Sequence, residues 1–131
     1  MPAAAALAHG GTSLSPYDPL RRAIDVTLRS GQRDFAVFDS SMLVGVLTRE
    51  DVAQGFQRYG PDALVGRVMN TSFPVAQASD TLLDLQRKMQ ASGSSAISVI
   101  EGRRFLGLVT LEDIRNAFRP RPKRRWRPES A

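Results

Sequence analysis

The chain has 131 residues, no cysteine and a single histidine, His9, and its formal net charge is +5. This length suits one compact domain or two small halves that share a core. The absence of cysteine excludes disulfides and thiolate chemistry, and His9 lies in an Ala/Gly-rich leader, so the sequence predicts neither an enzyme nor a metal site. No stretch approaches the ~20 apolar residues needed to cross a bilayer, and we expect a cytoplasmic location.

The basic character lies at the end of the chain. Residues 119–131 hold six Lys or Arg side chains and one Glu, whereas basic and acidic residues balance over residues 1–118. We predict a disordered leader over residues 1–11 and a disordered basic tail over residues 120–131. The tail, which includes Trp126, is either a solvated segment or a binder of nucleic acid or anionic membrane, because Arg neutralises phosphates.

Residues 18–31 predict an amphipathic helix of about three turns. Asp18 is placed to accept from the free amides at its start, with Pro19 at the first helical position, and Gly31 is placed to end it. The inner face is predicted from residues that recur at helical spacing: Leu20, Ala23, Ile24, Thr27 and Leu28.

Two apolar runs follow, residues 35–38 and 42–47, and the short polar connection between them predicts a β-hairpin. Gly45 inside the second run indicates the close approach of another backbone or a ligand. Thr48 is placed to cap a helix that continues to Tyr59 and ends at Gly60. Residues 61–71 are expected to form a linker with one helical turn.

The same order of elements returns in the second half. Phe73, Pro74 and Val75 predict a short extended segment, and Asp80 is placed to begin a helix that ends at Gly93. Its predicted inner side consists of Leu82, Leu83, Leu85, Gln86 and Met89. Residues 96–100 and 105–109 predict a second hairpin, and residues 111–118 a last helix. Each half therefore predicts the order β-α-β-β-α, which is an α+β fold.

The two halves are copies of one another. Residues 35–56 align on residues 97–118 without a gap, at a constant offset of 62 residues. Identical residues in the block include Val37, Gly45, Thr48, Asp51 and Phe56, which recur as Val99, Gly107, Thr110, Asp113 and Phe118. Two copies are too few for an open array, so we predict a closed, pseudo-two-fold pair of repeats over residues 12–60 and 72–119.

The repeated junctions between strand and helix read GVLTRED from Gly45 to Asp51 and GLVTLED from Gly107 to Asp113. In this framework they resemble the CBS domain, named after cystathionine β-synthase, and the duplication is similar to a tandem CBS pair. Within that family, the stretches GQRDFAVFD, VLTREDV and DALVGRVM resemble the regulatory CBS region of site-2-protease-like (M50) membrane metalloproteases. The protease motif HExxH is absent from this chain.

The resemblance implies a regulatory module whose clefts hold an adenosine compound such as AMP, ADP, ATP or S-adenosylmethionine, with no required cofactor. It implies that Asp51 and Asp113 accept from ribose hydroxyls, which suits a carboxylate facing a cis-diol. It also implies that Thr48, Thr110 and Arg33 lie near phosphate, and that Phe73, Pro74 and Val75 line an adenine pocket. Ser95 stands at the position of Arg33 in the second repeat, and Gly11, Thr12 and Ser13 replace the apolar segment in the first, so the two clefts are expected to differ.

Several alternatives remain open at the level of sequence. Thr48 with Asp51, and Thr110 with Asp113, also match a capping box, which needs no ligand. Arg33 also suits a solvated cation paired with the neighbouring Asp34. For the chain as a whole we predict a homodimer that signals to a partner or effector domain, and the alternative is a dimerisation module of the same fold with empty clefts.

Overall fold

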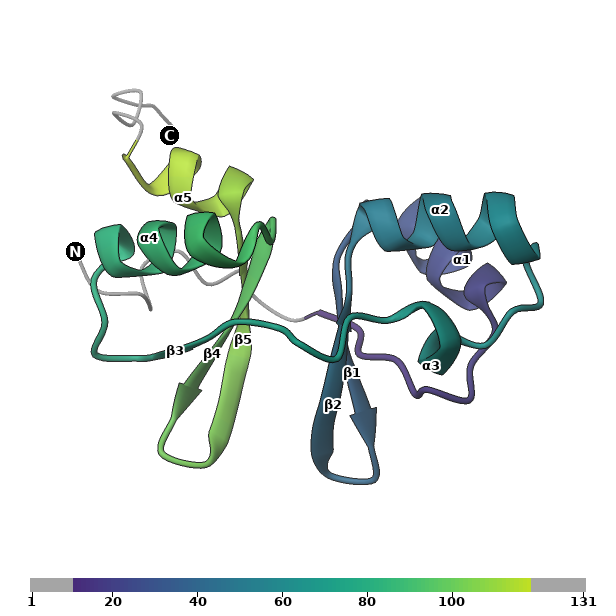
Figure 1. Cartoon of the computed structure of the whole chain (residues 1–131), viewed down its shortest axis with the longest axis horizontal. Helices are drawn as coiled ribbons and strands as arrows, with labels where there is room; N and C mark the ends of the chain where they lie inside the picture. The colour runs from purple at the N-terminus through teal and green to yellow at the C-terminus, as the bar shows by residue number, and fades with distance from the viewer. Residues whose placement is uncertain (1–10, 119–131) are drawn as a thin grey trace, which may run out of the picture.

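The computed structural model describes residues 11–118, and the predicted leader and basic tail lie outside this range except for Gly11. Two similar units stand next to each other (Figure 1). The first contains α1 (Leu20–Ser30), β1 (Phe35–Asp39), β2 (Met42–Leu47) and α2 (Arg49–Tyr59). After the short helix α3 (Val65–Val68), the second contains β3 (Val75–Gln77), α4 (Leu82–Ser92), β4 (Ala96–Glu101), β5 (Arg104–Thr110) and α5 (Leu111–Phe118). The α+β fold with two repeats is confirmed.

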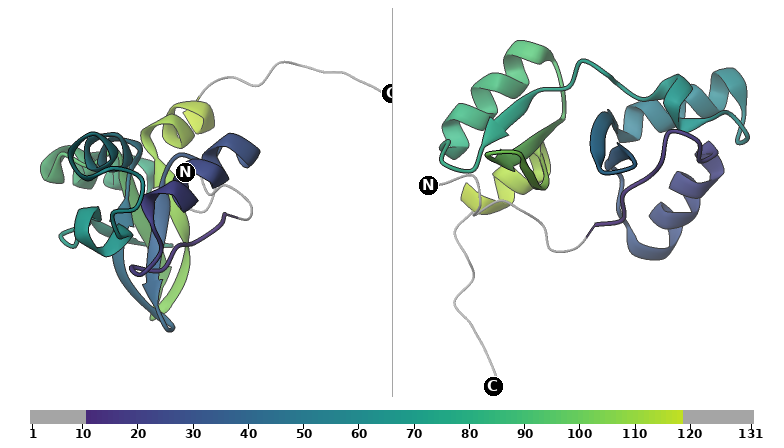
Figure 2. Two further views of the ribbon diagram at one scale, coloured as in Figure 1. Left: turned by 90° about the vertical axis from the view of Figure 1, so that its right-hand side faces the viewer. Right: turned by 90° about the horizontal axis from the view of Figure 1, so that it is seen from below.

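Each unit is built on an antiparallel hairpin, β1 with β2 and β4 with β5. The pairing register shifts at equivalent points of the two hairpins, after Val37 and after Val99. Both hairpins extend towards the same side of the molecule, and the helices α1, α2, α4 and α5 lie towards the opposite side (Figures 1 and 2). The duplication therefore preserves an irregularity of the backbone as well as the order of the elements.

The two sheets differ in one strand. In the second unit β3 adds in parallel to β4, so the sheet has three strands. In the first unit only Leu14 pairs, with Val37, which is the same contact that Ala76 makes with Val99 in the second. The prediction of a full first strand is wrong for this unit, because the residues before Leu14 are Gly or carry hydroxyls and offer no apolar surface to hold them in a sheet.

Each unit also has its own hydrophobic core. The first core consists of Leu14, Leu20, Ala23, Phe35, Val37, Leu47 and Val65. The second consists of Ala76, Leu82, Leu85, Met89, Ile97, Val99, Val109 and Ile114. Between the units β1 contacts β5, and the rings of Phe38 and Phe105 meet edge to face with their centroids 5.1 Å apart. The two cores are therefore separate, and the units meet where β1 contacts β5.

The starts of α1 and α4 differ from the prediction. Pro19 is the N-cap of α1 and makes no side-chain cap, because the Asp18 carboxylate instead accepts from the Ser15 amide at 2.8 Å. Asp80 likewise accepts from the Gln77 amide at 2.9 Å, and α4 begins with Thr81 as its cap. Both aspartates stabilise the turn that leads into the helix, so their assignment as helix caps is wrong.

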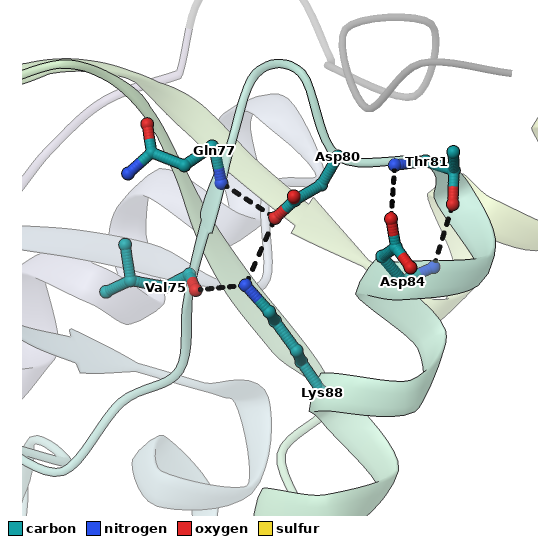
Figure 3. A network of polar contacts seen from close by, with 6 residues as sticks. All are labelled: Val75, Gln77, Asp80, Thr81, Asp84 and Lys88. Atoms are coloured by element: carbon teal, nitrogen blue, oxygen red, sulfur yellow. Dashed lines mark hydrogen bonds and ion pairs between the residues drawn. The ribbon is translucent and has the colours of Figure 1, made fainter.

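The turn before α4 is also tied to the helix that follows it. The Lys88 ammonium donates to the Asp80 carboxylate at 3.1 Å and to the Val75 carbonyl at 3.3 Å (Figure 3). In the capping box of α4, Asp84 accepts from the Thr81 amide at 3.0 Å. The segment around β3 is therefore fixed to α4 by side-chain contacts as well as by its pairing with β4.

The glycine predictions are confirmed where the backbone requires glycine. Gly31 and Gly93 end α1 and α4 in the left-handed conformation, with φ of 80° and 69°. A Cβ on Gly45 would lie 2.5 Å from the Met69 sulfur and 3.2 Å from the Asn70 carbonyl oxygen. The linker backbone therefore passes directly over β2 at this point. Within residues 11–118, no helix combines the length and the hydropathy that a membrane span requires.

Candidate ligand-binding cleft

A cleft of about 820 Å³ lies between the two units. The first unit contributes the segment 11–13, the residues that follow α1, and the start of α2, whereas the second contributes β5 and the start of α5. Its apolar lining consists of Ala36, Phe105, Leu106, Leu108 and Leu111. The volume falls in the range of ~300–1,000 Å³ that is typical of small-molecule sites.

Thr110 and Asp113 lie in this cleft at the start of α5. The Thr110 amide donates to Asp113 Oδ2 at 2.9 Å, and the Asp113 amide donates to the Thr110 hydroxyl at 3.1 Å. These reciprocal bonds form a capping box. Asp113 Oδ1 accepts no hydrogen bond from any other described residue, so the cap leaves one carboxylate oxygen available to a ligand. Capping and ligand binding are therefore compatible at this motif.

Thr48 and Asp51 form the same capping box on α2, with distances of 2.9 and 3.2 Å, but neither lines the cleft. Thr48 is buried, and Asp51 lines a separate cavity of about 560 Å³ along α2 and α3. The two predicted motifs thus have the same local geometry and different surroundings. Only the motif of the second repeat faces the large cleft.

Arg33 is exposed and lines the cleft together with Ser95, its counterpart in the second repeat. The prediction that Arg33 pairs with Asp34 is wrong, because the ion pairs recorded within residues 11–118 include neither residue. The Asp34 carboxylate instead accepts from the Arg49 amide at 3.0 Å, at the first residue of α2. Arg33 is therefore unpaired within the described part of the chain and available to an anionic group.

Asp34 is a cleft residue that the sequence interpretation missed. Burial raises the pKa of its carboxyl, the hydrogen bond from the Arg49 amide partly opposes this, and the charge of Asp113 raises the pKa further. Its counterpart in the second repeat is Ala96, and the backbone carbonyl of Ser95 accepts from the Leu111 amide in its place at 3.1 Å. The sequence contains one signal that could have identified Asp34: its carboxyl group is present in the first repeat and absent from the second.

We expect Asp34→Asn to raise the free energy of unfolding at neutral pH. In the parent protein, the folded state binds the proton of the Asp34 carboxyl more tightly than the unfolded chain does, so the contribution of Asp34 to stability is greatest at low pH. It is lost as the pH rises from the ordinary value of 3.8 through the raised folded pKa. The Asn side chain keeps an oxygen acceptor for the Arg49 amide and has no charge to bury. Urea unfolding between about pH 3 and 7 measures the difference.

The matched control is Asp84→Asn. Hydrogen bonding from the Thr81 amide lowers the pKa of Asp84, so its contribution has the opposite sign: it is present at neutral pH and lost as the pH falls through the folded pKa. Asp84→Asn should therefore be less stable than the parent at neutral pH. An Asp34→Asn variant that behaves like Asp84→Asn would show that burial does not dominate at Asp34.

Phe73, Pro74 and Val75 do not line the cleft. The Pro74 carbonyl accepts from the Ser98 amide at 3.1 Å, and Val75 pairs with Ser98 in the sheet, so these residues complete the second unit. Their repeat counterparts, residues 11–13, do line it. The small residues Gly11, Thr12 and Ser13 therefore line the cleft, whereas the apolar segment that was expected there lies outside it.

The CBS domain family matches residues 12–57 and 65–120, which is most of the chain, and the chain belongs to that family. No protein with a curated description matches the sequence.

Solved structures of CBS domains share the fold. The CBS domain pair of protein MJ0100, in complex with 5′-methylthioadenosine and S-adenosyl-L-methionine, is similar with a TM-score of 0.80 and 20% identity, covering 90% of this chain and 95% of that one. An uncharacterised conserved protein from Pyrococcus horikoshii gives 0.79 and 22%, covering 94% and 96%. Hypoxic Response Protein I, with two coordinated zinc ions, gives 0.74 and 22%, covering 92% and 100%. At these identities the likeness establishes the fold.

Among the residues that the structure describes, no group of three His, Cys, Asp or Glu side chains is arranged to hold a metal ion. The chemical groups of the cleft are carboxylates, guanidinium groups, hydroxyls and an apolar strand face. Such groups bind an organic ligand by hydrogen bonding, charge and apolar contact. The arrangement therefore suits recognition of a small polar molecule that has one flat apolar part.

Proposed function

We propose that this CBS pair is a regulatory module that binds an adenosine compound in the cleft and transmits its occupancy to a partner domain. The observation that carries the proposal is the position of Asp113, whose free carboxylate oxygen lies in a cleft that also holds Arg33 and the apolar face of β5. The carboxylate would accept from ribose hydroxyls, the guanidinium would bind a phosphate or carboxylate, and β5 would contact the adenine. The ligands named for the MJ0100 pair support this class of compound.

A thermal-shift screen tests the proposal with adenosine, AMP, ADP, ATP, 5′-methylthioadenosine and S-adenosylmethionine. A ligand present at 100 times its dissociation constant should stabilise the folded state by about 2.7 kcal/mol. Comparing adenosine with AMP then isolates the effect of the phosphate. If no compound shifts the unfolding temperature and equilibrium dialysis detects no binding, the adenosine proposal is wrong.

The second candidate is a dimerisation module with an empty cleft. It is favoured by the capping boxes of α2 and α5, which are both complete without a ligand. In this reading the Thr and Asp residues of the repeated motif serve only to begin the helices. A cleft that binds none of the six compounds, in a chain that still dimerises, would support it.

We propose a homodimer under either candidate. Phe56 on α2 and Phe118 on α5 stand at equivalent positions of the repeat, and their exposed fractions are 48% and 55%. Burying two aromatic side chains of this kind against a second copy would remove apolar surface from water. Light scattering should give a mass near twice 14.4 kDa. A monomeric mass at a concentration of order 100 μM, where even weak dimers form, would contradict this prediction.

The remaining features of the proposal follow from the sequence. The resemblance at GQRDFAVFD and DALVGRVM supports a site-2-type membrane metalloprotease as the effector, with the module on the cytoplasmic side. We assign the module no catalytic activity and no required cofactor, and keep the repeat boundaries at 12–60 and 72–119 with residues 61–71 as the linker. Binding of nucleic acid or anionic membrane by residues 119–131 stays a prediction.

A further inference from the structure

A second hollow lies outside the cleft, between α2 and α3. This α2–α3 groove has a volume of about 560 Å³, and its polar lining consists of Asp51, Gln54, Gln57, Arg58, Tyr59 and Arg67. At Gly55 the two helices are in close contact, because a Cβ there would lie 2.5 Å from a methyl carbon of Val68. Most of the lining comes from the carboxyl-terminal half of α2, and the two arginines lie at this end of the groove.

Two positive charges lie together at this end of the groove. The guanidinium carbon of Arg67 lies 4.1 Å from the centroid of the Tyr59 ring, which is a cation–π contact. Hydrogen bonding by Arg58, and next by Arg67, lowers the pKa of the Tyr59 hydroxyl. The ion pairs recorded within residues 11–118 involve other basic residues, and neither Arg58 nor Arg67 has a carboxylate partner there.

The nearby negative charge does not balance these arginines. The carboxyl end of α2 contributes roughly half a negative charge, which is well below two positive ones. Asp51 lines the groove, but its carboxylate accepts from the Thr48 amide at the other end of the helix. It stands seven residues before Arg58, which is about 10 Å along a helix that rises 1.5 Å per residue. The end of the groove that holds Arg58 and Arg67 therefore has an excess of positive charge.

The groove is not a copy of the cleft. Arg58 and Tyr59 stand at the end of the first repeat and Arg67 stands in the linker, so the cluster lies outside the block that the two repeats share, residues 35–56 and 97–118. Thr48 and Asp51, by contrast, recur in the second repeat as Thr110 and Asp113. A cluster that is not part of the repeated motif points to a function separate from that motif.

We propose that the α2–α3 groove binds a phosphate group, with Arg58 and Arg67 as its charged contacts. The planar guanidinium presents parallel N–H donors that match phosphate oxygens in a bidentate manner. The side-chain amides of Gln54 and Gln57 and the Tyr59 hydroxyl supply neutral donors around the same space. The phosphate belongs either to a soluble phosphate compound or to a lipid headgroup that carries a phosphomonoester, and in both cases the terminal phosphate presents the same anionic oxygens.

The test titrates inorganic pyrophosphate into the full chain and follows backbone amide signals by NMR. This readout is local, so anion binding by the basic tail is seen separately. We expect saturable shifts over residues 54–59 and 65–68, and an affinity lower by about tenfold or more in Arg58→Gln and in Arg67→Gln, since each removes a charged hydrogen bond. Arg67→Lys keeps the charge but loses the paired N–H donors of the guanidinium, so its affinity for pyrophosphate should fall between those of the parent and Arg67→Gln.

Arg104→Gln is the matched control, because it removes an exposed arginine from the first residue of β5, away from the groove. It should leave the affinity unchanged, and the thermal shift with an adenosine compound should remain in Arg67→Gln. The proposal fails if no saturable shift appears up to about 10 mM pyrophosphate, where binding is worth less than ~3 kcal/mol. It also fails if Arg104→Gln weakens binding as much as Arg67→Gln.

A second arm identifies the source of the phosphate. Vesicles of phosphatidylcholine with and without a phosphatidylinositol phosphate are sedimented with the parent, Arg67→Gln and Arg104→Gln. Sedimentation that requires the phosphoinositide and is lost only in Arg67→Gln assigns the groove to a lipid headgroup. Vesicle binding that is equal in all three proteins, together with the NMR result above, assigns it to a soluble phosphate compound.

Discussion

Asp113→Ala is expected to weaken binding of the adenosine ligand by about tenfold to a hundredfold. The Asp113 carboxylate lies in the cleft with one oxygen free of the helix cap, so it can accept from ribose hydroxyls, and a hydrogen bond to a charged group is worth about 1.5–3 kcal/mol. Asp51→Ala should have a smaller effect, because Asp51 lies outside the cleft. Isothermal titration of the three proteins with the compound found in the thermal-shift screen measures the difference.

The control must separate lost binding from a lost helix cap. Asp84 occupies the same kind of capping box on α4, with its amide 3.1 Å from the Thr81 hydroxyl, and it lies outside the cleft. Asp84→Ala should therefore lose stability as Asp113→Ala does and keep the affinity of the parent. Equal affinities in Asp113→Ala, Asp51→Ala and the parent would show that the repeated aspartates serve only as caps.

Phe35→Ala should lower the free energy of unfolding by about 3–5 kcal/mol. The Phe35 side chain is fully buried at the centre of the first core, so its removal leaves a cavity that neighbouring side chains fill only in part. A loss of this size is a large fraction of the ~5–15 kcal/mol that stabilises a typical domain. Urea unfolding followed by circular dichroism measures the change.

Met42→Ala serves as the comparison for Phe35→Ala, since it also truncates a large apolar side chain of the same hairpin. Met42 is 70% exposed, so its loss should change stability by no more than ~0.5 kcal/mol. If the two variants differ by less than about 1 kcal/mol, packing around Phe35 contributes far less than its burial indicates.

The sequence was sufficient for the repeated framework. Thr48 and Thr110 cap α2 and α5 as predicted, because a hydroxyl followed three residues later by an acid satisfies two amides through local contacts alone. Gly31 and Gly93 end their helices for an equally local reason, since their backbone angles favour glycine. Features that depend only on residues nearby in the sequence could therefore be predicted.

The errors lie where the sequence pattern allows more than one outcome. Leu28 and Leu83 follow the helical period but are 81% and 49% exposed, because periodicity does not show where a neighbouring element ends. Asp18 and Asp80 bond backwards to a turn, although each stands where a cap was expected. An aspartate before a helix can accept from either side, and the sequence does not contain the information that decides between them.

The cleft itself could be predicted only in part. The resemblance identified Thr110, Asp113 and Arg33, which the structure brings together, but it placed the apolar segment around Phe73 with them. Whether a cleft is open depends on the side chains that fill it from the facing unit. On that side Gly11 leaves space, and such a difference follows from three-dimensional packing.

The contact between the two units has a mechanical consequence. Because each unit keeps its own core, a change in the angle between the units would expose neither core, but it would disturb the ring contact of Phe38 with Phe105. An aromatic pair of this kind is worth only ~0.5–1.5 kcal/mol beyond its buried area. A molecule that contacts both walls of the cleft would favour the angle at which both contacts form. The exposed Phe56 and Phe118, one on each unit, would then change their positions relative to each other.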